Sequence, residues 1–262
     1  FRYLQGDGVE KNIDEAIKYY KLAASKGNAE SQLTLGLCYF QGLHVEKNEK
    51  EAFRLFSQSA EKGNREAYCM MATCFEEGIG VDASINETIK YYKLGADAGD
   101  SQCQLQLGYK YIRGNEVEKN VDEGIKYFRL SADQGKEIAQ YELGVIYHEG
   151  KLLEQNYEEA FKFFKLSADQ GYTRGLNNVA MFYINGTGVE KNEEEAFKIY
   201  KNLADADFIE PKLNLAICYL QGIGVEQNVE EAIRLFKILA DGGSDEAKQC
   251  LEICYKHQEN KV

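Results

Sequence analysis

The stretch Gly186-Thr187-Gly188-Val189-Glu190-Lys191-Asn192-Glu193-Glu194-Glu195-Ala196 decides the fold. It has the pattern of a glycine turn, an aliphatic residue and the start of a helix. The Asn192 side chain can accept a hydrogen bond from a first-turn amide, and the Glu195 side chain can reach back to the Asn192 amide. The stretch therefore predicts a turn that leads into a capped α-helix.

The same pattern occurs seven times at a fixed interval of 36 residues. Its first glycines are Gly6, Gly42, Gly78, Gly114, Gly150, Gly186 and Gly222. A fixed period of this length is typical of a repeat protein, in which each unit packs only on its neighbours. We therefore predict a single repeat domain of about seven units over residues 1–262. The chain begins in mid-repeat and without methionine, so it looks like a fragment of a longer protein.

Each period predicts two helices, as the unit from Asn28 to Gly63 illustrates. The first runs from Asn28 to about Gln41 and the second from Asn48 to about Lys62, where Gly63 suits a left-handed cap. Helices of this length are marginal alone in water, so stacking must stabilise them. The expected fold is all-α, a right-handed superhelical solenoid of helix-turn-helix repeats. It would end in a polar capping helix at about 245–257, because Glu252 replaces the small residue of the other units.

The run Leu35-Gly36-Leu37-Cys38-Tyr39, the Gly42 turn and the end Ala60-Glu61-Lys62-Gly63 resemble the Sel1-like repeat (SLR) family. That family is a tetratricopeptide-like α-solenoid, and the resemblance covers the whole chain. Departures are local: His44, Glu116 and Leu152 replace the second turn glycine, and Asp207 replaces the terminal one. The resemblance implies a scaffold or adaptor for protein complexes.

Charge and cysteine placement limit the partners and the compartment. The net charge is −12, which repels phosphate backbones and anionic lipid, so we expect no nucleic-acid partner. No apolar run is long enough for membrane insertion. Four of the seven cysteines, Cys38, Cys74, Cys218 and Cys254, share one repeat position, which indicates buried reduced thiols. A cytoplasmic location is favoured, and a secreted or lumenal one stays open because the chain looks like a fragment.

Catalytic and ligand-binding patterns are weak. The three histidines, His44, His148 and His257, fall in different units, and the glycine turns are followed by no phosphate-binding lysine. Cys250, Cys254 and His257 share a helix face that could hold zinc, but Cys254 merely occupies its repeat position. We expect no catalytic residue, metal site or cofactor. A basic repeat position that includes Lys198 is expected to pair with acids four residues earlier, such as Glu194.

A candidate groove remains on the first helices, at positions that differ between units and are mostly apolar. A partner peptide or helix would fit such a surface, and apolar or basic segments would suit it. Acids would edge the groove: Glu30, Glu66, Glu76, Glu77, Glu149 and Glu210. The predicted partner-binding residues are Leu37, Phe40, Tyr109, Ile112, Tyr141, Val145, Met181, Ile184, Ile217 and Leu220. The alternative is that neighbouring first helices simply pack on one another through these residues.

The favoured function is therefore a protein-interaction scaffold that is not an enzyme and whose oligomeric state is open. A secreted or lumenal module for host interaction or quality control is one alternative. A β-lactam-binding or β-lactam-hydrolysing SLR protein is another. It is disfavoured because such relatives carry cysteine pairs in every unit, whereas two of the complete units here have no cysteine.

Overall fold

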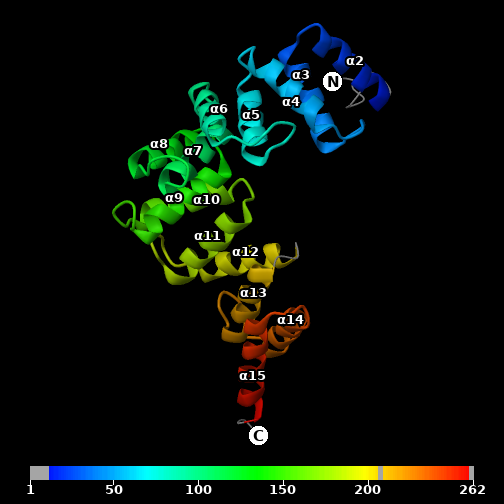
Figure 1. Ribbon diagram of the computed structural model, residues 1–262. Coiled ribbons are helices and arrows are strands. Elements are labelled where there is room, and N and C mark those ends of the chain that lie inside the picture. The colour runs from blue at the N-terminus through cyan, green and yellow to red at the C-terminus, as the bar shows by residue number, and fades with distance from the viewer. Residues whose placement is uncertain (1–11, 206–208, 260–262) are drawn as a thin grey trace. The chain divides into compact units, whose positions relative to one another are not determined.

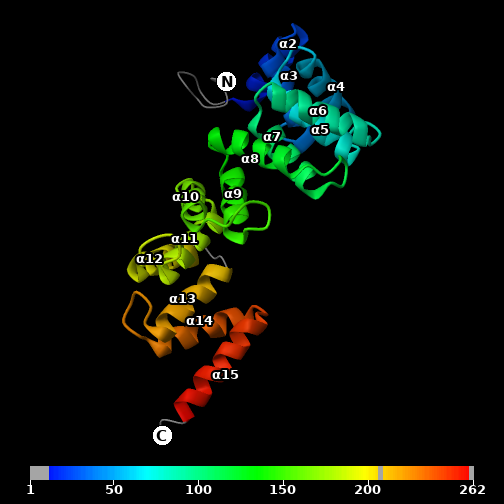
Figure 2. The same cartoon turned by 90° about the vertical axis from the view of Figure 1, so that its left-hand side faces the viewer.

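The computed structural model describes residues 12–205 and 209–259, and the described residues form helices without strands. First and second helices of each repeat alternate along the chain (Figures 1 and 2). The helices up to residue 136 are α2 (Ile13–Ser25), α3 (Ala29–Gln41), α4 (Glu49–Ala60), α5 (Arg65–Glu77), α6 (Ile85–Asp97), α7 (Ser101–Arg113) and α8 (Val121–Asp133). Those that follow are α9 (Glu137–Glu149), α10 (Tyr157–Ala168), α11 (Thr173–Asn185), α12 (Glu193–Asp205), α13 (Ile209–Gln221), α14 (Val229–Asp241) and α15 (Asp245–Glu259).

The helices belong to two compact units, residues 1–136 and 137–262. Unit 1 contains α2 to α8 and unit 2 contains α9 to α15. Within each unit every helix packs against the next one in the chain. The all-α architecture of repeated helix pairs predicted from the sequence is confirmed.

The predicted helix ends are also confirmed. The side chain of Asn48 accepts a hydrogen bond from the Glu51 amide at 3.1 Å, and Asn192 does the same with Glu195 at 3.0 Å. Glycines end both kinds of helix in the left-handed conformation, for example Gly63 with φ +79° and Gly186 with φ +65°. Gly6 and Asp207, which the sequence analysis also assigned to turns, lie outside the described residues.

The second half of the predicted capping pair is wrong. The Asn192 amide donates to the carbonyl oxygen of Tyr183 at 2.9 Å instead of to Glu195. The Glu195 carboxylate is thereby left to pair with Lys198, three residues later, at 3.3 Å. The expected pairing of Lys198 with Glu194 is also wrong, because Lys198 pairs with Glu195 instead.

A close backbone contact explains why the second turn position is glycine in these repeats. Gly224 has φ +66°, and a methyl group added to it would overlap the carbonyl oxygen of Glu193, the first residue of α12. Gly188 meets the carbonyl of Tyr157 in the same way. Both of these turns therefore lie directly against the start of the preceding second helix.

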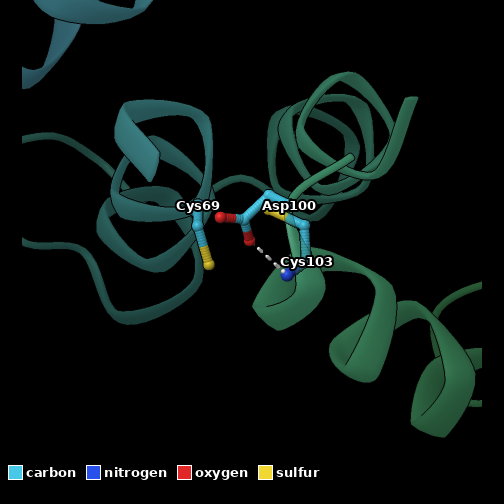
Figure 3. Close-up of side chains that lie close together, drawn as sticks. All are labelled: Cys69, Asp100 and Cys103. Carbon is cyan, nitrogen blue, oxygen red and sulfur yellow. Dashed lines mark hydrogen bonds between the residues drawn. The ribbon is translucent and has the colours of Figure 1, made fainter. Parts of the chain in front are cut away.

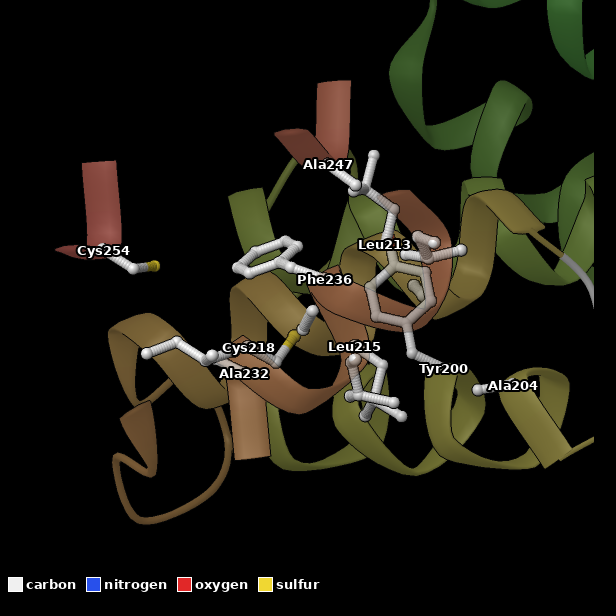
Figure 4. Close-up of a cluster of buried hydrophobic side chains, with 14 of the residues drawn as sticks. Tyr200, Ala204, Leu213, Leu215, Cys218, Ala232, Phe236, Ala247 and Cys254 are labelled. Atoms are coloured by element: carbon white, nitrogen blue, oxygen red, sulfur yellow. The ribbon is translucent and has the colours of Figure 1, made fainter. Parts of the chain in front are cut away.

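Each core joins helices of successive repeats. In unit 2, Tyr200 of α12, Phe236 of α14 and Ala247 of α15 belong to one buried cluster (Figure 4). Serine hydroxyls add hydrogen bonds between the helices of a pair: Ser131 Oγ donates to the Ser101 carbonyl at 2.7 Å, and Ser59 and Ser167 repeat the bond. None of the described helices is long and apolar enough to cross a membrane.

Candidate binding face

Four positions of the first helices carry side chains that are exposed or half-buried wherever the structure describes them. In α11 this stripe consists of Arg174, Asn178, Met181 and Asn185, which are exposed except for the half-buried Asn178. Spacings of four, three and four residues place them on one side of an α-helix. We call these four positions, with their equivalents in the other first helices, the open stripe.

In unit 2 the third position of the open stripe is apolar in all four first helices. It is occupied by Val145, Met181, Ile217 and Ile253, which we call the apolar file. Met181 is 42% exposed and Ile253 54% exposed, whereas Val145 and Ile217 are half-buried. Apolar side chains that recur at one position, two of them exposed, indicate a surface on which a partner can bury area.

In unit 1 the same position carries Leu37, Thr73 and Tyr109, and the stripe also contains charged residues. Exposed carboxylates stand at its ends in α3 and α5, namely Glu30, Glu66 and Glu77. The Arg113 guanidinium lies over the Tyr109 ring, 5.0 Å from its centroid. Unit 1 therefore presents a mixed apolar and acidic stripe with one arginine–aromatic contact.

The structure separates the ten predicted groove residues by what they contact. Five lie on the open stripe: Leu37, Tyr109, Val145, Met181 and Ile217. Met181 is the exposed one of these five; the others are half-buried, and Leu37, Val145 and Ile217 also pack against buried clusters. Four lie at a half-buried position that faces the neighbouring helices: Phe40, Ile112, Ile184 and Leu220. Among these, Ile112 borders Gly124 of α8, and both Ile184 and Leu220 pack on the core of unit 2. The tenth, Tyr141, contacts the rings of Phe164 and Tyr172 at 5.7 and 5.4 Å.

A charged cluster around the buried Lys110 lies beside the stripe in unit 1. Lys110 of α7 pairs with Glu76 of α5 at 2.7 Å and with Glu116 of the following turn at 2.5 Å. The Tyr92 hydroxyl donates a 2.6 Å hydrogen bond to Glu76. Sequence analysis missed Lys110, although a signal existed: lysine occupies the repeat position of Cys38 and Cys74.

Burial and the contacts of the cluster shift the pKa values of Glu76 and Tyr92 in opposite directions. Burial alone would raise the pKa of Glu76, but hydrogen bonds from Lys110 and Tyr92, with the lysine charge, outweigh it and lower that pKa. Burial, and then the hydrogen bond to Glu76, raises the pKa of Tyr92. The groups are therefore paired within the cluster, and they are suited to positioning α5, α6 and α7 rather than to proton transfer.

The thiols at the shared cysteine position are poor nucleophiles. Burial raises the pKa of Cys74 to about 12 and that of Cys218 to about 11. A thiol with such a pKa stays protonated near neutral pH, whereas the thiolate is the reactive species. The Cys254 thiol is also buried, and the third member of the possible zinc set, His257, has its side chain outside the described residues.

Of the two described histidines, one lies among aromatic rings and the other in a turn. His148 lies among aromatic rings, 5.8 Å from the Tyr157 ring and 5.6 Å from the Phe182 ring between centroids. His44 occupies the second turn-glycine position with φ +63°. Neither has a hydroxyl nucleophile and carboxylate arranged around it in the interactions found among the described residues.

Comparison with protein-family models identifies the repeats. The Sel1 repeat model matches residues 1–28, 29–64, 65–100, 101–136, 138–172, 173–208 and 212–244. The chain belongs to the Sel1 repeat family. The matched segments follow the 36-residue period, and a search of curated proteins found no match.

Solved structures of Sel1 repeat proteins are similar to this chain. One is c5321, a protective antigen of uropathogenic Escherichia coli with an SLR fold, at 30% identity and a TM-score of 0.83. The match covers 98% of this chain but only 55% of c5321, so the chain spans about half of that protein. A Sel1 repeat protein from Oxalobacter formigenes matches at 23% identity and a TM-score of 0.75, covering 86% of this chain and 99% of the other.

A third similar structure is the immunity protein Pa5087 from Pseudomonas aeruginosa. It matches at 21% identity and a TM-score of 0.51, with 73% of each chain covered. At this identity the likeness, like that to the Oxalobacter protein, concerns the fold alone.

Proposed function

We propose that this Sel1 repeat chain is a non-catalytic scaffold that holds a peptide or helical segment of a partner protein on its open stripes. Sel1 repeat proteins generally mediate protein–protein interactions. The observation that carries the proposal is the apolar file, in which Met181 and Ile253 expose large apolar side chains on first helices 72 residues apart in the chain. Burying such side chains against a partner lowers the free energy of the complex.

Charge supports a partner segment that combines apolar and basic residues. In unit 1, Glu30, Glu66 and Glu77 stand beside the apolar position of the open stripe, and the chain as a whole carries −12. Complementary charge raises the association rate and disfavours acidic partners, more than it adds affinity. The high pKa values of the Cys74 and Cys218 thiols agree with a role in binding rather than catalysis.

Selection from a phage-displayed library of random peptides on the immobilised chain tests the proposal. We expect enriched peptides to combine apolar and basic residues. Their affinity should fall at least about tenfold in Met181→Glu, because the carboxylate would have to be desolvated against an apolar partner side chain. No enrichment, or unchanged affinity in this variant, would contradict the proposal.

Ile238→Glu is the matched control. Ile238 is also an exposed apolar residue of unit 2, but it lies on the second helix α14, away from the open stripe. This variant should keep the affinity of the wild type. Thermal unfolding of both variants must be measured alongside, so that lost binding is not confused with lost structure.

A further inference from the structure

Three potential metal ligands meet in the interior of unit 1. They are Cys69 of α5, Asp100 at the N-cap of α7, and Cys103 in the first turn of α7 (Figure 3). Their two sulfur atoms and one carboxylate oxygen all lie within 4.8 Å of one another. The residues are 9%, 7% and 0% exposed. This cluster lies apart from the open stripe and takes no part in the binding proposed above.

The other repeats provide an internal reference for the two cysteines. The position of Cys69 carries leucine in three units, as Leu33, Leu105 and Leu213. The position of Cys103 carries alanine in three units, as Ala67, Ala139 and Ala247. Leu33 and Ala67 belong to one buried cluster, and so do Leu213 and Ala247. In those repeats a large side chain therefore lies beside a small one. At Cys69 and Cys103 two side chains that can bind a metal replace this pair.

Two further departures converge on the same point. Asp100 stands where asparagine caps the equivalent helices, at Asn28 and Asn64. Gly95 stands where Ser59, Ser131 and Ser167 make their interhelix hydrogen bonds. A methyl group at Gly95 would overlap the sulfur of Cys103, so the glycine makes room for that sulfur. The repeat loses a serine hydrogen bond and gains a second thiol and a carboxylate.

The donor set suits zinc. Zinc binds thiolate at about 2.3 Å and carboxylate at about 2.0 Å in a tetrahedron, which requires ligand atoms about 3.5–3.8 Å apart. Because the three atoms already lie within 4.8 Å of one another, small side-chain rotations bring them to those separations. Asp100 is already oriented, because its Oδ1 accepts a 2.7 Å hydrogen bond from the Cys103 amide. Soft thiolate ligands also exclude magnesium and calcium, which prefer oxygen.

We propose that Cys69, Asp100 and Cys103 form a zinc site that ties α5 to α7, two successive first helices of unit 1. On binding, each thiol releases one proton to solvent and its sulfur donates the electron pair to the ion. The fourth tetrahedral position is left for water or another exogenous ligand. The site stabilises unit 1 because the ion binds the folded arrangement and not the unfolded chain.

Titration of the reduced full chain with Co²⁺, in a phosphine reductant, tests the site directly. We expect a thiolate-to-cobalt charge-transfer band in the near ultraviolet that saturates at one ion per chain and is displaced by Zn²⁺. The double variant Cys69→Leu/Cys103→Ala restores the leucine–alanine pair of other repeats, so it should fold normally and show no band. A band that persists in this variant, or no band in the wild type, would overturn the proposal.

Two single variants separate this site from the other thiols. Asp100→Asn keeps a helix cap of the kind at Asn28 and Asn64 but loses the anionic ligand. Its Zn²⁺ affinity should fall by about tenfold or more, as changes around metal ligands do. Cys74→Ser removes a buried thiol outside the cluster and should bind Zn²⁺ as the wild type does. Equal affinity in wild type and Asp100→Asn, or lost binding in Cys74→Ser, argues against the assignment.

Discussion

The Nζ atom of Lys110 lies 2.7 Å from Oε1 of Glu76, and only 9% of the lysine side chain is exposed. A buried lysine must be paired to remain charged, and here two carboxylates and the face of the Tyr92 ring surround it. The three helices that carry Glu76, Tyr92 and Lys110 belong to two successive repeats. This contact therefore joins two successive repeats of unit 1 through charged and polar groups.

Lys110→Cys should destabilise unit 1 by about 2 kcal/mol. Cysteine fits the position, as Cys38 and Cys74 show, but Glu76 and Glu116 would lose their common cation. Removing one partner of a fully buried ion pair costs about 3–5 kcal/mol, and the two carboxylates here are partly exposed, which reduces the cost. Urea unfolding measures the change. The exposed Lys126→Ala should cost less than about 0.5 kcal/mol, and an equal loss in both variants would contradict the role of burial.

The same pair predicts a loss of stability in acid. The pKa of Glu76 is lowered in the folded protein, so its contribution is present above the ordinary glutamate value of about 4.3. Stability is lost as the pH falls through the lower, folded-state pKa, because the carboxylate then gains a proton. Glu51 and Glu231 are shifted in the same direction by Arg54 and Arg234, so the wild-type slope alone is not diagnostic. The difference between wild type and Glu76→Gln isolates this group: it should shrink below pH 4, and a pH-independent difference would contradict the assignment.

Periodicity made the fold predictable, because a 36-residue interval fixes which positions are core, turn and cap in every repeat. It could not decide between two hydrogen-bond partners of similar reach. The Glu195 side chain pairs with Lys198 because the Asn192 amide is occupied by the Tyr183 carbonyl, nine residues earlier, and only the turn geometry brings those together. Cys69 and Cys103 could not be recognised as neighbours from the sequence, because they are 34 residues apart and form no local motif.

The exposed positions of the first helices were partly predictable for the same physical reason. Variation between repeats finds positions that are free to change, but it does not distinguish exposed positions from those packed on a neighbour. Met181 and Ile184 are three residues apart and both vary, yet Met181 is exposed and Ile184 packs against the core of unit 2. The exact rotation of each helix on its neighbours separates them, and that is a property of the packed structure.

Gly95→Ser should destabilise the wild type and be rescued by Cys103→Ala. The serine Cβ would overlap the Cys103 sulfur, and overpacking of a core costs about 1–3 kcal/mol. With alanine at 103 the pair becomes that of Ser59 and Ala67, with room for the serine and a carbonyl for its hydroxyl. A double-mutant cycle by urea unfolding should give a coupling of about 1 kcal/mol or more. Additive effects would mean that glycine at position 95 is not needed to accommodate the Cys103 sulfur.

Gly224→Ala should cost more than Gly243→Ala, although both glycines have positive φ. At Gly243 no atom lies within 4 Å of the added methyl group, so only the left-handed strain of about 1–2 kcal/mol remains. At Gly224 the methyl group also overlaps the Glu193 carbonyl, which is backbone and cannot rotate away. We expect an additional loss of about 1–3 kcal/mol, or local displacement of the turn. Equal losses by thermal unfolding would contradict the close approach of turn and helix.

Ile184→Glu and Met181→Glu together decide between a binding surface and packing at the variable positions. Ile184 is half-buried against the core of unit 2, so a carboxylate there must be desolvated or must push the helices apart, at a cost of about 2 kcal/mol. Met181 is exposed on the open stripe, and its substitution should change stability by less than about 0.5 kcal/mol. Urea unfolding of both variants checks this. If Ile184→Glu is as stable as wild type, Ile184 belongs to the open surface after all. If Met181→Glu is strongly destabilised, the stripe is a packing face and the proposed binding there fails.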